Sequence, residues 1–269
     1  MCIRDRLIVG ERINASRKPI AVAIESRAIK VIQDEAKAQD EAGADYIDVN
    51  AGLFGDKEAE YLQWMVQGIQ VVTDKPLCID SADPEAIELV MPLLAKPPMI
   101  NSIIIERSRL ERVLPLVKKS RAKVIGLCQS EALIARSFKE KMELAGKLVE
   151  KVIETGIPLG DLYIDPLTFP LATDTTLAVA TLDAIEGIMR EYPGVHTICG
   201  LTNVSHGLPL RSLVNRTFLV AAMSRGLDAV IMDPTDKALY SAFKASMMLL
   251  GKDEFCLGYI QAFREGRLA

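Results

Sequence analysis

Carboxylates and amides recur along this chain at one kind of position, at or just after the end of a short apolar run. The set comprises Glu11, Asn14, Asp48, Asn50, Asp80, Asn101, Gln129, Asp165, Asn203 and Asp233. The opposite ends of the runs carry no comparable set. Asp can accept two parallel hydrogen bonds, and Asn can both donate and accept, so such side chains can hold one molecule by several hydrogen bonds.

The pattern is clearest in the stretch Gly200-Leu201-Thr202-Asn203-Val204-Ser205-His206-Gly207. An apolar run that begins at Val195 stops there at small polar residues, and a helical pattern begins near Leu210. This predicts a buried strand, a polar loop and a helix.

Eight such units fill the chain. Strands are predicted at 7–9, 46–50, 77–80, 99–102, 123–128, 162–165, 197–201 and 229–232. Helices are predicted at 22–42, 57–72, from 83, and at 108–119, 137–155, 175–192, 211–225 and 237–250, with a short closing helix after 255. Apolar strands alternating with amphipathic helices predict a parallel sheet covered by helices, and eight units predict a (β/α)8 TIM barrel. The alternative is a doubly wound open sheet, although Gly10-Glu11-Arg12-Ile13-Asn14 is not its usual phosphate motif.

A barrel would gather the strand-end side chains at one mouth. Some polar residues simply cap the following helix, and we assign that role to Asp83, Ser108 and Asp236. Four others close an apolar strand directly, so a carboxylate among them must be hydrogen-bonded or have a shifted pKa. These four are Asp48, Asp80, Asn101 and Asp165.

Composition narrows the function. The chain has 269 residues, a net charge of −4 and only 5% aromatic residues, with no basic tract and no long apolar run. These features argue against nucleic-acid binding and a membrane span, and we expect a cytoplasmic protein of one domain over residues 7–269. Residues 1–6 (MCIRDR) suggest a foreign leader. We expect no metal: zinc on Cys78, Cys128 and Cys199 is the alternative to small buried thiols.

A mouth rich in Asp and Asn, with neither a histidine-rich metal site nor a glycine-rich phosphate loop, suits a flat heterocycle with several N–H donors. A pterin ring has such an edge. Seven segments of the chain resemble the methyltetrahydrofolate:corrinoid protein methyltransferases, which are pterin-binding barrels. They are 10–14 (GERIN), 48–50 (DVN), 78–81 (CIDS), 100–102 (INS), 163–166 (YIDP), 200–205 (GLTNVS) and 215–219 (NRTFL). The resemblance runs from about residue 7 to 260.

The resemblance implies a homodimer that moves a methyl group between N5 of methyltetrahydrofolate and the Co(I) of a corrinoid (cobalamin) on a partner protein. It implies pterin contacts from Asp80, Asn101 and Asp165, and a contact to N5 from Asn203. Catalysis is then expected from Asn203 and Asp80, and pterin binding from Asp48, Asn50, Asp80, Asn101, Asp165, Gly200 and Asn203. Further contacts at the mouth are expected from Glu11, Asn14, His206, Arg211 and Asp233.

The sequence leaves several alternatives open for the site and for the reaction. His206 stands where acetogenic members have glutamine, and is either a mouth contact or a loop residue. A dihydropteroate synthase would need late lysine, arginine and histidine residues, whereas the eighth strand here ends in Asp233-Pro234. A tetrahydromethanopterin-dependent enzyme and a non-catalytic pterin-binding protein stay open, as does the direction of transfer.

Overall fold

Strands and helices alternate along the chain, as a computed structural model shows for residues 6–269. The strands are β1 (Leu7–Asn14), β2 (Tyr46–Asn50), β3 (Leu77–Asp80), β4 (Met99–Ile105), β5 (Lys123–Ser130), β6 (Leu162–Asp165), β7 (His196–Thr197) and β8 (Ala229–Met232). The helices are α1 (Lys18–Glu25), α2 (Ile29–Glu41), α3 (Glu58–Ile69), α4 (Pro84–Val90), α5 (Arg107–Ser120), α6 (Phe138–Thr155), α7 (Thr176–Glu191), α8 (Arg211–Ser224), α9 (Lys237–Leu249) and α10 (Leu257–Arg264). Short 3-10 turns are η1 (Gly52–Lys57), η2 (Met91–Leu93), η3 (Leu159–Asp161), η4 (Leu201–Ser205) and η5 (Glu254–Cys256).

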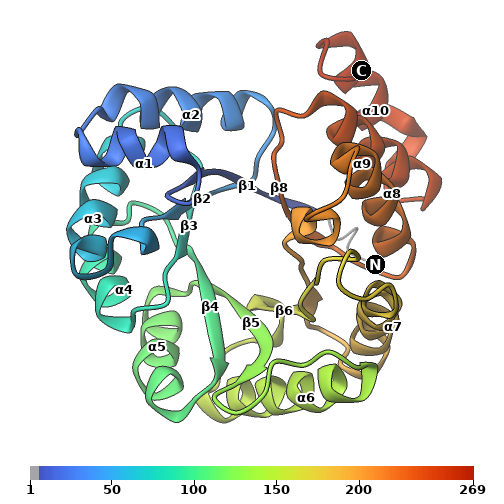
Figure 1. Cartoon of the computed structure of the whole chain (residues 1–269), viewed down its shortest axis with the longest axis horizontal. Helices are drawn as coiled ribbons and strands as arrows, with labels where there is room; N and C mark the ends of the chain where they lie inside the picture. Colours follow the sequence, from blue (N-terminus) through green and yellow to red (C-terminus); the bar gives the residue numbers. More distant parts are fainter. Residues whose placement is uncertain (1–5) are drawn as a thin grey trace.

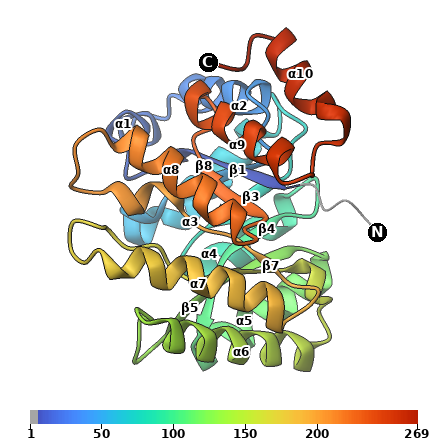
Figure 2. The same cartoon turned by 90° about the vertical axis from the view of Figure 1, so that its right-hand side faces the viewer.

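The strands form one parallel sheet in the order β7-β6-β5-β4-β3-β2-β1-β8. Viewed down the short axis they make a ring with the helices outside (Figure 1), and the side view shows α6, α7 and α8 stacked along its flank (Figure 2). A single parallel bridge between Gly200 and Ile231 joins the two ends of the sheet, and the Ile231 N–H donates to the Cys199 carbonyl at 3.0 Å. The predicted TIM barrel is therefore confirmed.

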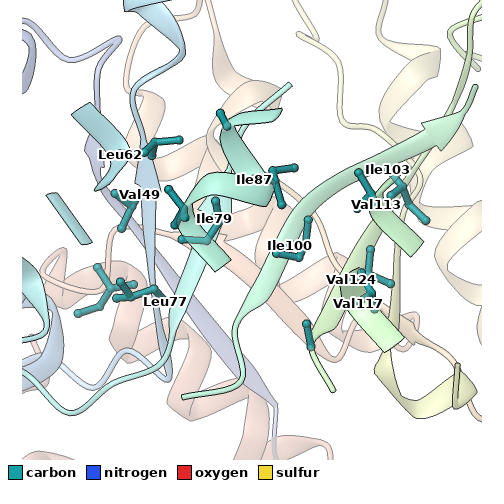
Figure 3. Packing of buried hydrophobic residues seen from close by; sticks show 14 of the residues in the cluster. Val49, Leu62, Leu77, Ile79, Ile87, Ile100, Ile103, Val113, Val117 and Val124 are labelled. Carbon is teal, nitrogen blue, oxygen red and sulfur yellow. The ribbon is translucent and has the colours of Figure 1, made fainter. Parts of the chain in front are cut away.

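Alternation along the strands builds two apolar layers, because successive side chains of a strand point to opposite faces. Between strands and outer helices, residues such as Ile79, Ile100 and Val124 pack against Leu62 and Val113 (Figure 3). Inside the barrel, a separate cluster is formed by Val9, Cys78, Met99, Ile125, Tyr163, Ile198 and Ala229. A strand residue two positions beyond one of these inner residues therefore points into the barrel at its mouth.

Three expectations about local structure were wrong. The helix predicted at 22–42 is two helices, because Arg27 adopts a left-handed conformation with φ of 54° and ends α1. The seventh strand covers only His196–Thr197, since the chain turns into η4 at Leu201. Ser108 does not cap α5: the N-cap position is Glu106, and the Ser108 hydroxyl donates to the Glu106 carboxylate. Asp83 and Asp236 do cap their helices, as predicted.

Two predictions concern the chain's start and its cysteines. Residues 1–5 of the suggested leader lie outside the described residues, while Arg6 donates to the carbonyls of Leu227 at 2.8 Å and Met223 at 2.9 Å. Cys78, Cys128 and Cys199 are buried, as small apolar residues would be. Within residues 6–269 no helix is long and apolar enough to cross a membrane, and no group of three or more His, Cys, Asp or Glu residues could hold a metal ion.

Candidate pterin site at the barrel mouth

A cavity of about 650 Å³ lies where the strands end. Its lining includes eight of the residues predicted from the sequence: Glu11, Asn14, Asp48, Asp80, Asn101, Asn203, Arg211 and Asp233. It also includes Arg12, Ser16, Arg17, Thr202, Ser212, Asn215, Ile231 and Asp236. The strand-end pattern therefore located the cavity correctly.

A polar row across three adjacent strands borders the cavity, which Asp80 and Asn101 line and Asn50 adjoins. Asn50, Asp80 and Asn101 are direct partners in the registers of β2, β3 and β4. Asn50 Nδ2 donates to Asp80 Oδ2 at 3.0 Å, and Asn101 Nδ2 lies 3.4 Å from Asp48 Oδ1. Asp80 lies two positions after Cys78, and Asn101 lies two positions after Met99. Cys78 and Met99 point into the barrel, so the side chains of Asp80 and Asn101 point to the same face and into the cavity.

Three of the carboxyl groups that line the cavity have pKa values raised by burial. Burial, reinforced by nearby Asp80, raises the pKa of Asp48 well above its usual value. Burial also raises the pKa of Asp80 to about 6, although the hydrogen bond from Asn50 opposes the shift. Across the mouth, burial and the charge of Asp233 raise the pKa of Glu11 to about 7. Asp80 and Glu11 can therefore hold or release a proton near neutral pH.

Arg109, which sequence analysis did not single out, braces the ends of β3 and β4. Its guanidinium is buried and donates to the backbone carbonyls of Ser81, Ala82 and Ser102. The Ser81 hydroxyl in turn donates to buried Glu58. Because these carbonyls directly follow Asp80 and Asn101, the arginine fixes the backbone that carries both side chains. Its position in the first turn of an otherwise ordinary helix gave no sign of this role.

Asp165 ends β6 but does not line the cavity of the described chain. Its carboxylate accepts the Leu167 N–H at 2.7 Å and the backbone N–H of Gly200, while burial raises its pKa to about 6. Beside it, Lys141 is fully buried and donates to the carbonyls of Pro166 and Leu167. The carboxylate thus ties the end of β6 to the segment that precedes η4, and the ammonium group ties the loop after β6 to α6.

η4 carries Asn203 into the cavity. The Asn203 side chain is exposed at the mouth, and Gly200, which does not line the cavity, lies behind it. Arg211 holds η4 from the first turn of α8, because its Nε donates to Ser205 Oγ at 3.1 Å and its NH2 to the Thr202 carbonyl at 2.9 Å. His206 is exposed and does not line the cavity, in keeping with the loop-residue alternative.

The β1 and β8 side of the mouth is an ionic network. Arg12 donates to Asp233 at 2.7 Å and forms a two-pronged pair with Glu35. Asp233 also accepts from the backbone and hydroxyl of Thr235, and Asn14 accepts the Ser16 N–H at 2.9 Å. Asp233 and Asn14 are therefore largely engaged in holding their own loops.

Lining residues that were not predicted from the sequence lie in several segments. Arg12, Ser16 and Arg17 lie near the end of β1, beside the predicted Glu11 and Asn14. Asn215 lies inside the segment 215–219 that carries the family resemblance, and a buried amide within a helix is the signal that could have found it. Asp236, assigned only as a cap, both caps α9 and lines the cavity.

The cavity can hold a flat, hydrogen-bonding ring. Its described lining contains five carboxyl groups, four amides and three arginines, but no lysine, histidine or cysteine. Such a lining offers directional acceptors and donors and a store of protons rather than a strong nucleophile.

The sequence is similar to those of known proteins. The profile of a family described as pterin binding enzyme matches residues 10–233. The methylcorrinoid:tetrahydrofolate methyltransferase of Eubacterium limosum is 37% identical over 264 residues, which is 97% of each protein. The methionine synthase of Mycobacterium tuberculosis is 28% identical over 239 residues, covering 84% of this chain and 20% of that longer protein.

Solved structures agree on the fold. A dihydropteroate synthase from Xanthomonas albilineans, in complex with 7,8-dihydropteroate, superposes with a TM-score of 0.70 at 18% identity, over 94% of this chain and 95% of the other. The enzyme from Yersinia pestis gives a TM-score of 0.65 at 16% identity, over 94% of each chain. At this level of identity the likeness concerns the barrel alone.

Proposed function

Because the chain belongs to the pterin binding enzyme family, we propose that it is a methyltransferase acting between N5 of tetrahydrofolate and the cobalt of a corrinoid on a partner protein. The observation that carries this proposal is the row Asn50, Asp80 and Asn101 at a cavity lined by carboxyl groups and amides. The name of the Eubacterium limosum relative describes transfer from methylcorrinoid to tetrahydrofolate, and we propose the same direction.

The pterin would lie against the wall of carboxyl groups and amides. Asp80 and Asn101 would hydrogen-bond the ring, since a carboxylate accepts hydrogen bonds and an amide can both donate and accept. Asp48 adds a second carboxyl behind them, while Asp165 and Gly200 would complete the pocket from the β6 side. A ring held on several sides presents N5 in one orientation, and such positioning is a large part of catalysis for a two-substrate reaction.

Side chains of this protein would accept the proton that N5 releases during methyl transfer. The corrinoid supplies the methyl group and keeps the electron pair of the bond that breaks. As N5 gains the methyl group it must release its proton, and Asp80, with a pKa of about 6, is suited to accept it directly or through water. Asn203 would hydrogen-bond N5 and hold it in line, and in the reverse direction the same groups would return the proton.

The test mixes the purified protein with tetrahydrofolate and methylcobalamin without oxygen, and follows the visible spectrum. Loss of methylcobalamin with formation of methyltetrahydrofolate is the expected result, and Co(I) cobalamin with methyltetrahydrofolate tests the reverse reaction. Tetrahydrofolate binding without methyl transfer, even when the native corrinoid protein is supplied, would identify a pterin carrier. No tetrahydrofolate binding would favour a tetrahydromethanopterin substrate.

Two further proposals follow from the same resemblance. We expect a homodimer, and light scattering of the purified protein would report its mass. We also expect a cytoplasmic location, which fractionation of the source cells would test.

A further inference from the structure

Asn215 has an unusual environment for an amide. It lies in the second turn of α8, lines the cavity and is only 9% exposed. Its Oδ1 is buried and has no hydrogen-bond partner within residues 6–269. A buried polar atom without a partner destabilises a folded protein, so such atoms are rare and often belong to binding sites.

No nearby side chain completes this hydrogen bond. Arg211, four residues earlier on the same helix, is a strong donor, but it is directed to Ser205 and Thr202 of η4. The other buried residues of α8 are Phe218, Leu219, Ala222 and Met223, which are apolar. An apolar residue would therefore suit the fold at position 215 better than asparagine does.

Thr197 provides an internal comparison. Its Oγ1 is likewise buried and has no partner in the described chain, yet Thr197 lies on β7 and does not line the cavity. Of these two orphan oxygens, only that of Asn215 belongs to a residue that a ligand in the cavity can reach.

We propose that Asn215 is a substrate-binding residue whose Oδ1 accepts a hydrogen bond from a ring N–H of the reduced pterin. An amide oxygen is an acceptor, so the group that completes it must be a donor. Reduced pterins carry such ring N–H groups, whereas the methyl group in transfer and the cobalt carry none. This inference rests on the proposed function, because it takes tetrahydrofolate as the ligand.

The test separates stability from binding. Asn215→Leu keeps the volume of the side chain and removes its polar atoms. Without ligand, the variant should unfold at a higher temperature than the wild type, because the orphan oxygen is gone. Its Kd for tetrahydrofolate, measured by calorimetry, should rise about tenfold, because one hydrogen bond to the ligand is lost. Thr197→Val is the matched control: a higher unfolding temperature with an unchanged Kd.

Opposite changes in stability and affinity are the signature of a binding role. Equal Kd values for the wild type and Asn215→Leu would overturn the inference, as would a loss of stability and affinity together. If leucine disturbs the helix, Asn215→Ala gives the same comparison of Kd with a smaller side chain. A wild type that fails to bind tetrahydrofolate would instead refute the proposed function itself, so the two failures are distinguishable.

Discussion

The Asn50 amide holds the Asp80 carboxylate from the neighbouring strand, with Nδ2 3.0 Å from Asp80 Oδ2. The orientation of this amide is itself fixed, because its Oδ1 accepts the Gly52 N–H at 3.1 Å. Asn50 lies beside the cavity, where it orients Asp80 and favours its charged form, and its direct contact with the pterin stays a prediction.

Replacing Asn50 should therefore change the pH dependence of the reaction. Asn50→Ala removes a hydrogen bond that lowers the pKa of Asp80, so that pKa should rise above its present value of about 6. The acidic limb of the profile of kcat/KM against pH should move upward by roughly one pH unit. Asp80→Asn is the control that should remove this limb, and an unmoved limb in Asn50→Ala would show that Asp80 is not the group observed.

Asn203→Ala should slow methyl transfer by more than about tenfold, because a hydrogen bond that orients or polarises a reacting atom commonly contributes that much or more. The side chain is exposed at the mouth and supports no described core residue, so stability should hardly change. Single-turnover kinetics separate this effect from binding. An unchanged rate would end the proposed role at N5.

Asp165→Asn should weaken tetrahydrofolate binding and leave the barrel folded. The carboxylate holds the backbone N–H groups of Leu167 and Gly200, and an amide cannot accept as many hydrogen bonds. Calorimetry gives the affinity, and circular dichroism checks the fold. Wild-type affinity in this variant would place the pterin away from β6.

Stability should fall as the pH rises from 5.5 to 8. The pKa of Glu11 is raised to about 7 in the folded protein from an ordinary value of 4.5, so the folded state binds more protons than the unfolded state between these values. The contribution of Glu11 to the free energy of unfolding is fully present below about pH 4.5 and is lost as the pH rises through 7. Its loss between pH 5.5 and 8 amounts to at most about 2 kcal/mol, less where water in the cavity screens the charge.

Glu11→Gln tests this pH dependence, because it removes the titrating group and keeps its size. Denaturant unfolding at the two pH values should show a smaller difference for the variant than for the wild type. Glu131→Gln, at an exposed loop position, is the matched control and should retain the full difference. An undiminished difference in Glu11→Gln would assign the effect to other acids.

The sequence pattern predicted the barrel and half of the cavity lining, chiefly for one physical reason. Strand parity and the common direction of parallel strands bring strand-end residues together, so Asp48, Asp80 and Asn101 could be placed without a structure. Periodicity also located the helices to within a few residues, except where Arg27 breaks the first one while α1 and α2 both continue to pack on β1.

Other features depend on contacts between distant segments, which no local pattern encodes. Arg109 and Lys141 looked like ordinary charged residues of amphipathic helices, yet both are buried and bind the carbonyls of loops at the mouth. Asp165 obeys the strand-end rule, but its carboxylate is occupied by backbone N–H groups. Such partners become visible only when the helices are packed on the sheet.

The closure of the barrel has a consequence for its breathing motions. β7 is two residues long, and one bridge joins Gly200 to Ile231 across the last gap. Opening that gap breaks few hydrogen bonds, so amide hydrogen exchange at Ile231 should be faster than at the centre of β3, which is paired on both sides. Because η4 starts directly after Gly200, the segment that bears Asn203 is mounted on the most easily opened edge of the ring. A bound pterin that contacts both this edge and the ends of β3 and β4 should slow the exchange at Ile231, because it would hold the two sides of the gap together.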